Sequence, residues 1–382
     1  MKQSIIKLQE KNKRHRNKKR INYTLFITVC ILLILGSLMI FSAGYPHAKL
    51  HYNDGFYYIK RHFIFLSLGT FIMVLISRIK IEFVKKFSPF FYGFCLLLLV
   101  AVLFTGFSEG VAKRWLGIPG TPLSFQPSEL MKLGIILMLS WYLDKTKSRK
   151  RTILNGIILP GLILFSACAL ILLEKHLSGT VILAMIGMSV LFISGINLKR
   201  AGIIYGGTGI LGASVFLLTN SYAMKRIQSF FNPDADILSD KWQTTQGLYA
   251  IGSGGLWGLG YFNSRQKYSY VSEPQNDFIF TIWCEETGFV GAVVLVFVFL
   301  LFIWQGYKIA FDASDTYSTL VSFGIVSQIG IQAFLNMLVV LDVVPNTGIS
   351  LPFFSYGGSS LVILLLEIGI LLSISRNKDL RI

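Results

Sequence analysis

The feature that most constrains this chain is a series of apolar blocks, each about 18–25 residues long, which is the length that crosses a bilayer core. Hydrophobic residues make up 53% of the chain and charged residues only 14%, against roughly 25% charged residues in soluble domains. The pattern therefore excludes a soluble enzyme, a coiled coil and a disordered chain. It predicts an all-α polytopic membrane protein with about ten transmembrane helices. The predicted spans are 22–43, 59–79, 87–106, 127–143, 153–173, 178–196, 201–219, 281–306, 317–341 and 358–375.

Basic residues gather on one side of the predicted spans. The net charge is +17, and residues 1–21 carry nine Lys or Arg residues. If this tail is cytoplasmic, 24 of the 36 Lys and Arg residues lie on the cytoplasmic side, as the positive-inside rule requires. The tail has no interleaved aromatic residues and leads directly into a span, so we expect it to contact anionic lipid headgroups and no nucleic acid.

The chain divides into a basic tail (1–21), a membrane domain (22–376) and a short C-terminal tail (377–382). An even number of spans places both tails in the cytoplasm. The largest loop, 220–280, is then extracellular and lies between spans seven and eight. It is rich in glycine and aromatic residues, and a long ordered loop of this kind is more often functional than a spacer.

Ionisable residues within the spans are costly and require a partner or a function. Glu129 and Lys132 are spaced i, i+3 at the start of span four, which predicts an ion pair on one helix face. Glu285 and Glu286 lie in span eight, and we expect at least one of them to face protein or water. We assign these four residues structural or coupling roles. Residues 174–176 interrupt the apolar sequence, and we favour an interfacial turn there over a catalytic histidine.

The predicted extracellular face also carries a carboxylate and several cations. Asp277 directly precedes span eight, where it can serve as a general base beside an apolar wall or as a helix N-cap. The basic residues of this face lie beside glycines and aromatic residues, a setting that suits a phosphate group at the membrane surface, although interfacial snorkelling is an alternative. We expect phosphate contacts from Lys113, Arg114, Arg226, Arg265 and Lys267.

Several long motifs, in order along residues 22–376, resemble the SEDS family (shape, elongation, division and sporulation), and its FtsW/SpoVE branch more than RodA. They are Lys113–Trp115, Gln126–Glu129 with Lys132, Arg226 with Phe230–Pro233 and Asp236, Gln246 with Ala250–Gly255, Ser264–Lys267, Glu273, Asn276–Phe280 with Glu285 and Glu286, Pro345–Gly348, and Leu351–Ser360. One departure concerns His176, because many members have a carboxylate there.

The resemblance implies a ten-span peptidoglycan glycosyltransferase in the bacterial cytoplasmic membrane. It would polymerise lipid II, an undecaprenyl-diphosphate-linked disaccharide-pentapeptide, on the outer face during division, sporulation or elongation. It implies Asp277 as the catalytic residue or a metal ligand, and a divalent cation, Mg²⁺ or Mn²⁺. It also implies a class B penicillin-binding protein as partner, together with other divisome or elongation proteins. Among the motif residues we further expect substrate contacts from Gln246, Asn346 and Ser355.

Two other functions fit a polytopic protein of this kind. A lipid II flippase would need polar residues through the whole bilayer depth, whereas here they concentrate toward the predicted outer face. A non-enzymatic scaffold of the divisome would need neither Asp277 nor the outer cations. Both features favour the enzyme.

Overall fold

The computed structural model describes residues 22–108, 113–117, 124–147, 152–196, 241–346 and 348–376, with isolated positions between 202 and 230. The described part is almost entirely helical. Its elements are α2 (Tyr23–Tyr52), α3 (Tyr57–Ile76), α4 (Ile81–Thr105), β1 (Phe107–Ser108), β2 (Lys113–Trp115), α5 (Pro127–Lys145), the π-helical turn η2 (Leu154–Ile158), α6 (Leu159–Leu173), α7 (Leu177–Ile193), α10 (Trp242–Gly254), α11 (Ile279–Phe311), α12 (Thr316–Val340) and α13 (Gly358–Arg376).

The predicted all-α polytopic class is confirmed. Among the residues that the structure describes, seven helices are long and apolar enough to cross a membrane: α2, α3, α4, the continuous helix Leu154–Leu173, α11, α12 and α13. Helix α7 is apolar but shorter, and α5 occupies the charged span predicted at 127–143. The span predicted at 201–219 lies largely outside the described residues.

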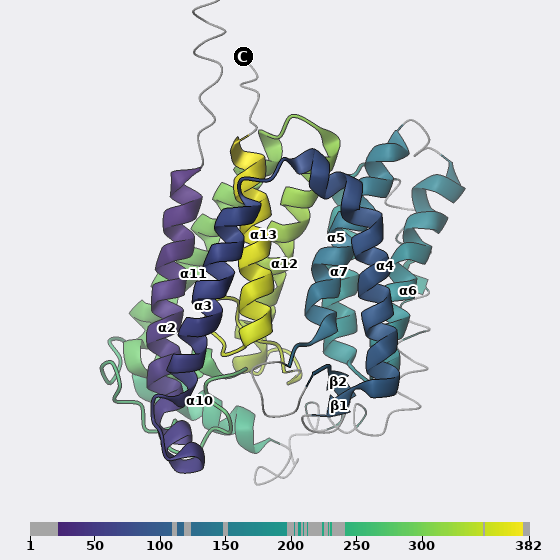
Figure 1. Cartoon of the computed structure of the whole chain (residues 1–382). Coiled ribbons are helices and arrows are strands. Elements are labelled where there is room, and N and C mark those ends of the chain that lie inside the picture. The colour runs from purple at the N-terminus through teal and green to yellow at the C-terminus, as the bar shows by residue number, and fades with distance from the viewer. Residues whose placement is uncertain are drawn as a thin grey trace, which may run out of the picture.

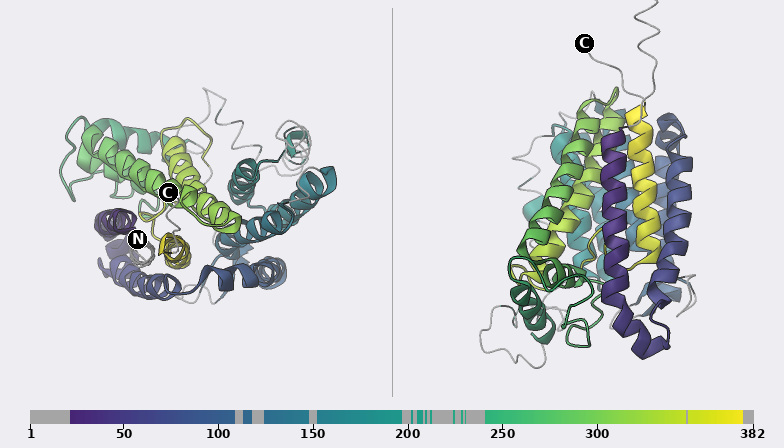
Figure 2. Two further views of the ribbon diagram at one scale, coloured as in Figure 1. Left: turned by 90° about the horizontal axis from the view of Figure 1, so that it is seen from above. Right: turned by 90° about the vertical axis from the view of Figure 1, so that its left-hand side faces the viewer.

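The helices run roughly alongside one another in a bundle, with the long loops at one end (Figures 1 and 2). The first and last spans meet at the opposite end, where the Asn22 amide donates a hydrogen bond to Ser375 Oγ at 3.3 Å. We call the end that carries β1, β2 and α10 the loop end. An even number of crossings predicts this arrangement of the two chain ends.

Helices α12 and α13 form the centre of the bundle. About 72% of the most apolar window of α12 and 67% of that of α13 are buried, against 17% in α3. The peripheral helices instead expose large apolar side chains, such as Phe71 in α3 and Phe90 in α4. An apolar outer surface of this kind suits contact with lipid. Polar side chains on the central helices α12 and α13 are instead surrounded by protein, where partners can offset their cost.

Helix α10 lies inside the segment 220–280, which the sequence indicated only as a loop. Its buried face carries Gln246, Ala250 and Gly254 at four-residue spacing. A Cβ atom at Gly254 would lie 2.2 Å from the carbonyl oxygen of Cys284, so glycine permits α10 to touch the α11 backbone. This packing outweighs the low helix propensity of a glycine-rich sequence.

Helix α11 is broken at Gly288, whose φ of 68° and ψ of −167° are not helical. The segment after α10 satisfies the backbone groups that the break releases. The Phe289 amide donates to the Gly255 carbonyl at 2.9 Å, and the Leu259 amide donates to the Glu285 carbonyl at 3.0 Å. Irregular backbone at membrane depth is tolerated only when protein satisfies it in this way.

Candidate active site at the loop end

Three consecutive carbonyl groups hold the chain at Asp277. The Gln275 carbonyl accepts from the Tyr356 amide at 2.8 Å, and the Asn276 carbonyl accepts from Ser355 Oγ at 2.8 Å. The Asp277 carbonyl accepts from Asn336 Nδ2 at 2.7 Å. Two distant elements, α12 and the segment 349–356, therefore fix the position of the predicted catalytic residue.

The residue after Asp277, Phe278, is buried and provides the apolar wall that the sequence predicts. The Asn276 side-chain amide donates to Glu273 Oε2 at 2.7 Å, so the side chain that anchors Asp277 is that of Asn336. A Cβ atom at Gly348 would lie 3.1 Å from Asp277 Oδ2, and Gly348 has a φ of +64°. Glycine at position 348 thus permits this backbone conformation and leaves no side chain against the Asp277 carboxylate on that side.

Glu129 and Lys132 form the ion pair that their spacing predicts, with Lys132 Nζ 2.8 Å from Glu129 Oε2. Lys132 Nζ also donates to Gln332 Oε1 at 2.8 Å, and Gln332 Nε2 donates to the carbonyl and hydroxyl oxygens of Ser350 at 3.1 Å. Asn336 Nδ2, which donates to the Asp277 carbonyl, also donates to the carbonyl of Ile349, the residue before Ser350. A continuous polar path therefore joins Asp277 to Lys132.

A small polar pocket of about 30 Å³ lies along this path. Glu129, Lys132, Gln332 and Ser355 are among its lining residues, so Ser355 belongs to the site where the sequence placed it. At its inner side, Glu367 of α13 accepts two hydrogen bonds from Gln328 Nε2, at 2.8 and 2.9 Å. The pocket is large enough for one or two water molecules.

A second cation, Arg114 of β2, lies against the α6–α7 connection. Its Nη2 atom donates to the Lys175 carbonyl at 2.8 Å. Burial raises the pKa of Glu174 to about 8, although Arg114 acts in the opposite direction. Burial, together with the charges of Arg114 and Lys132, lowers the pKa of His176 to about 3. The two cations therefore share a poorly solvated region in which His176 stays neutral at physiological pH.

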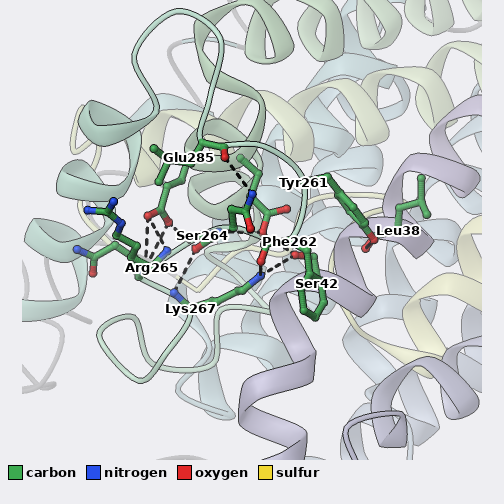
Figure 3. Close-up of polar contacts among 12 residues, drawn as sticks. Leu38, Ser42, Tyr261, Phe262, Ser264, Arg265, Lys267 and Glu285 are labelled. Atoms are coloured by element: carbon green, nitrogen blue, oxygen red, sulfur yellow. Dashed lines mark hydrogen bonds and ion pairs between the residues drawn. The ribbon is translucent and has the colours of Figure 1, made fainter.

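Glu285 ties the long loop before Asp277 to helix α11. Its carboxylate accepts from the Ser264 hydroxyl, from the Arg265 amide at 2.9 Å and from the Gln266 amide at 3.4 Å (Figure 3). The Arg265 side chain is exposed and points away from this carboxylate. Glu285 thus has a structural role, and Arg265 remains available for a ligand.

Lys267 lies in the interior and does not line the outer surface where we expected a phosphate contact. Its ammonium group donates to Glu286 Oε1 at 3.0 Å, to Ser42 Oγ at 3.1 Å and to the Phe262 carbonyl at 2.6 Å. Both side chains of the Lys267–Glu286 pair are 0% exposed. All three donors of the ammonium are used within the protein, so the structure favours a structural role for Lys267.

The remaining predicted substrate contacts fall in several places. Lys113 begins strand β2, and Arg226 lies outside the described residues. Gln246 is buried on α10. Asn346 donates to Gln243 Oε1 at 3.3 Å, which links the segment before Gly348 to α10. The structure therefore places Ser355 in the pocket lining, Arg114 against the α6–α7 connection and Gln246 in a packing position.

The sequence analysis missed two residues that hold the site together, Gln332 and Asn336. With Gln328 they form a stripe of amide side chains at four-residue spacing along α12. Three amides on one face of a membrane helix are unusual enough to have indicated a polar site.

The donor atoms near Asp277 fit a divalent cation only if its ligands come largely from the substrate. In the described residues, no group of three or more His, Cys, Asp or Glu side chains is placed to hold a metal ion. Mg²⁺ is commonly bound through one or two carboxylates together with substrate phosphates and water. Asp277 supplies one such carboxylate, so the site suits a cation that arrives with a diphosphate.

Comparison with known proteins places this arrangement in a family. The stage V sporulation protein E of Bacillus subtilis is 38% identical over 359 residues, which are 92% of this chain and 96% of that protein. A probable peptidoglycan glycosyltransferase FtsW of Geobacter sulfurreducens is 35% identical over 362 residues, covering 94% of this chain and 95% of the relative.

Solved structures show the same fold. A chain from a structure described as "Structural coordination of polymerization and crosslinking by a peptidoglycan synthase complex" has a TM-score of 0.76 at 25% identity, covering 94% of this chain and 98% of that one. The rod shape determining protein RodA of Thermus thermophilus has a TM-score of 0.69 at 26% identity, covering 94% and 97%. The sequence model of the FtsW/RodA/SpoVE family, described as cell cycle proteins, matches residues 23–380. This confirms the family expected from the motifs: the chain belongs to the FtsW/RodA/SpoVE family of cell cycle proteins.

Proposed function

We propose that this protein is a peptidoglycan glycosyltransferase that polymerises lipid II. The relatives named above support the activity. The observation that carries it is the fixed position of Asp277 on a polar path that leads to the buried cation Lys132. Arg114 lies near this cation, because the charges of both act on His176. A carboxylate and a cationic pocket at one end of a membrane bundle are what transfer between lipid-linked sugars requires.

In this proposal Asp277 removes the proton from the 4-hydroxyl group of the acceptor sugar. The freed oxygen attacks the anomeric carbon of the donor, and the bond from that carbon to the lipid diphosphate breaks. Lys132 and Arg114 stabilise the negative charge that the departing diphosphate gains. One carboxylate acting as base on a direct displacement inverts the anomeric configuration.

A divalent cation, Mg²⁺ or Mn²⁺, would be held by Asp277 and the diphosphate oxygens. When bound, it would supply additional positive charge for the leaving diphosphate. The anchoring of residues 275–277 by Ser355 and Asn336 orients the carboxylate whether or not the cation is bound.

The proposed topology places the loop end outside the bacterial cytoplasmic membrane and both chain ends in the cytoplasm. The charge bias of the sequence supports this orientation. The start of the first helix and the end of the last helix also lie on the same side of the bundle. Cysteines introduced as Gln3→Cys and Asp240→Cys test it with an impermeant thiol reagent on intact cells. Labelling at position 240 and protection at position 3 are expected, and labelling at position 3 would contradict the orientation.

The proposed partner is a class B penicillin-binding protein that cross-links the new strands. The related structure that combines polymerisation with crosslinking supports this choice. Co-purification of tagged protein with the transpeptidase from membranes is the direct check, and a role among other divisome or elongation proteins follows from the same family membership.

Polymerisation of lipid II by the purified protein, alone and with its transpeptidase, tests the function. We expect glycan strands from wild type in the presence of Mg²⁺ or Mn²⁺ and none from Asp277→Asn. Transport of lipid II across vesicles without polymer would indicate a flippase. Normal cell growth with Asp277→Asn, in the absence of polymer in vitro, would indicate a scaffold.

A further inference from the structure

A third cation, Arg61, lies at the loop end on the first turn of α3. Its guanidinium carbon is 4.2 Å from the centre of the Tyr57 ring. Its charge also acts on Tyr356, where it opposes the rise in the Tyr356 pKa that burial causes. A guanidinium that lies over an aromatic ring is restricted in orientation, so its N–H groups point in preferred directions.

Within the part of the chain that the structure describes, Arg61 forms no ion pair with a carboxylate. Among the described residues, the ion pairs are Lys60–Asp54, Lys85–Asp144, Lys132–Glu129 and Lys267–Glu286. The neighbouring Lys60 therefore has a carboxylate at 2.8 Å, whereas half-buried Arg61 does not. An oriented guanidinium at the membrane boundary without a carboxylate is a binding group for an external anion, and its fork geometry matches phosphate.

Arg61 is connected to the same segment that fixes the catalytic loop. The Tyr356 amide holds the Gln275 carbonyl, and the Tyr356 ring packs edge-on against Tyr58 at 4.8 Å. The first residue of the segment from Ser350 to Tyr356 is thus linked to Lys132 through Gln332. Its last residue, Tyr356, lies near Arg61. Two separate cationic positions are linked to the backbone of Asp277.

We propose that Arg61, with Tyr57 and Tyr356, forms a second diphosphate subsite that holds the lipid-linked acceptor. The proposal rests on the proposed function, because a polymerase must hold two lipid diphosphates at once. Lys132 and Arg114, whose charges both act on His176, suit the diphosphate that departs, since its charge grows during the reaction. Arg61, which is half-buried and lies on a different helix, suits the diphosphate that stays intact.

An aromatic surface next to Arg61 supports a sugar-bearing ligand. The rings of Tyr52 and Tyr57 are stacked with centres 3.7 Å apart, and Tyr52 is 47% exposed. Flat aromatic faces at a wet boundary pack against the apolar faces of sugar rings, while their hydroxyl groups stay hydrated. A bulk phospholipid headgroup would use the cation but not this surface.

The number of diphosphate sites on the purified protein tests the proposal. Farnesyl diphosphate is titrated into full-length protein in neutral detergent, and bound ligand is counted by equilibrium dialysis. Wild type should bind two molecules, and Arg61→Ala should retain one tight site, with affinity at the other reduced about 10-fold or more. Lys60→Ala removes the same charge one residue away and should still bind two.

Three results would overturn the subsite. They are one site in wild type, two unchanged sites in Arg61→Ala, and displacement of the Arg61-dependent ligand by phosphatidylglycerol as effectively as by lipid II, which would identify a bulk headgroup contact. If Arg61→Ala does not fold, Arg61→Lys keeps the charge and loses the fork, and unchanged affinity in it would also refute the proposal. Lipid II polymerisation by wild type is measured separately, so failure of the proposed function is distinguishable.

Discussion

Replacing Lys267 by methionine distinguishes a structural lysine from a phosphate-binding one. Methionine keeps most of the side-chain volume and removes the ammonium group. It leaves the Glu286 carboxylate, which is 0% exposed, without its counter-charge, and leaves the Phe262 carbonyl without its donor. Breaking one side of a buried pair typically costs about 3–5 kcal/mol. We expect the free energy of unfolding to fall by about that amount.

Neutralising the partner should reverse most of this loss. Glu286→Gln keeps an oxygen that accepts from Ser42 Oγ and removes the unpaired charge. Replacing both members of a buried pair by neutral groups is often close to neutral in stability. The double variant Lys267→Met/Glu286→Gln should therefore unfold within about 1–2 kcal/mol of wild type. It should also polymerise lipid II at a comparable rate, because the loop from 262 to 267 stays attached to α11.

The assay is SDS titration in mixed micelles, followed by tryptophan fluorescence, with polymerisation measured on the same samples. Arg265→Met is the stability control. Because the Arg265 side chain is exposed, its replacement should lower the free energy of unfolding by less than about 0.5 kcal/mol. A double variant with wild-type stability but no activity would show that Lys267 contacts substrate. A single Lys267→Met variant as stable as wild type would refute the reasoning about the buried charge.

Three further outcomes are expected. Asp277→Asn should fold normally and lose at least about 10²-fold in polymerisation rate, and a residual activity above a tenth would exclude a base. Glu129→Ala and Lys132→Ala should each reduce activity and stability, and the charge-swapped double variant should regain part of both; wild-type behaviour of each single variant would contradict this. Because the folded pKa of Glu174 is raised to about 8, its contribution to stability is full below pH ~4.5 and is lost as pH rises through 8. His176, with its pKa lowered to about 3, acts in the opposite sense below pH ~6.5. Thermal unfolding of Glu174→Gln should thus lose the decline of wild type between pH ~6.5 and 8, and an unchanged decline would assign it elsewhere.

Local patterns predicted a large part of this protein. Apolar blocks of about 20 residues determine membrane helices because a bilayer core requires that length. The i, i+3 spacing of Glu129 and Lys132 determined their ion pair, since helix geometry alone places both on one face. At least one of Glu285 and Glu286 was expected to face protein or water, because two adjacent carboxylates cannot both be left in lipid, and both are buried within the protein.

The partners of these residues came only with the tertiary structure. Lys132 meets Gln332 across 200 positions of sequence, and Asp277 meets Asn336 across 59. Such contacts depend on how α5, α11 and α12 pack, and no local period records that packing. The break at Gly288 likewise depends on tertiary structure, because the segment after α10 pairs with the backbone groups that the break releases.

The sequence by itself determined the environment of the chain, the approximate positions of most of the described helices, and the residues too polar to lie in a membrane without a partner or a function. The tertiary structure decided what each of those residues does. It buried Lys267 against Glu286, and it joined Lys132 to the backbone of Asp277 through Gln332 and Asn336. Among the described residues it left Arg61 without a carboxylate partner. The physical reason is that the cost of placing a charge in a membrane is local. The groups that offset this cost are chosen by packing between segments far apart in the chain.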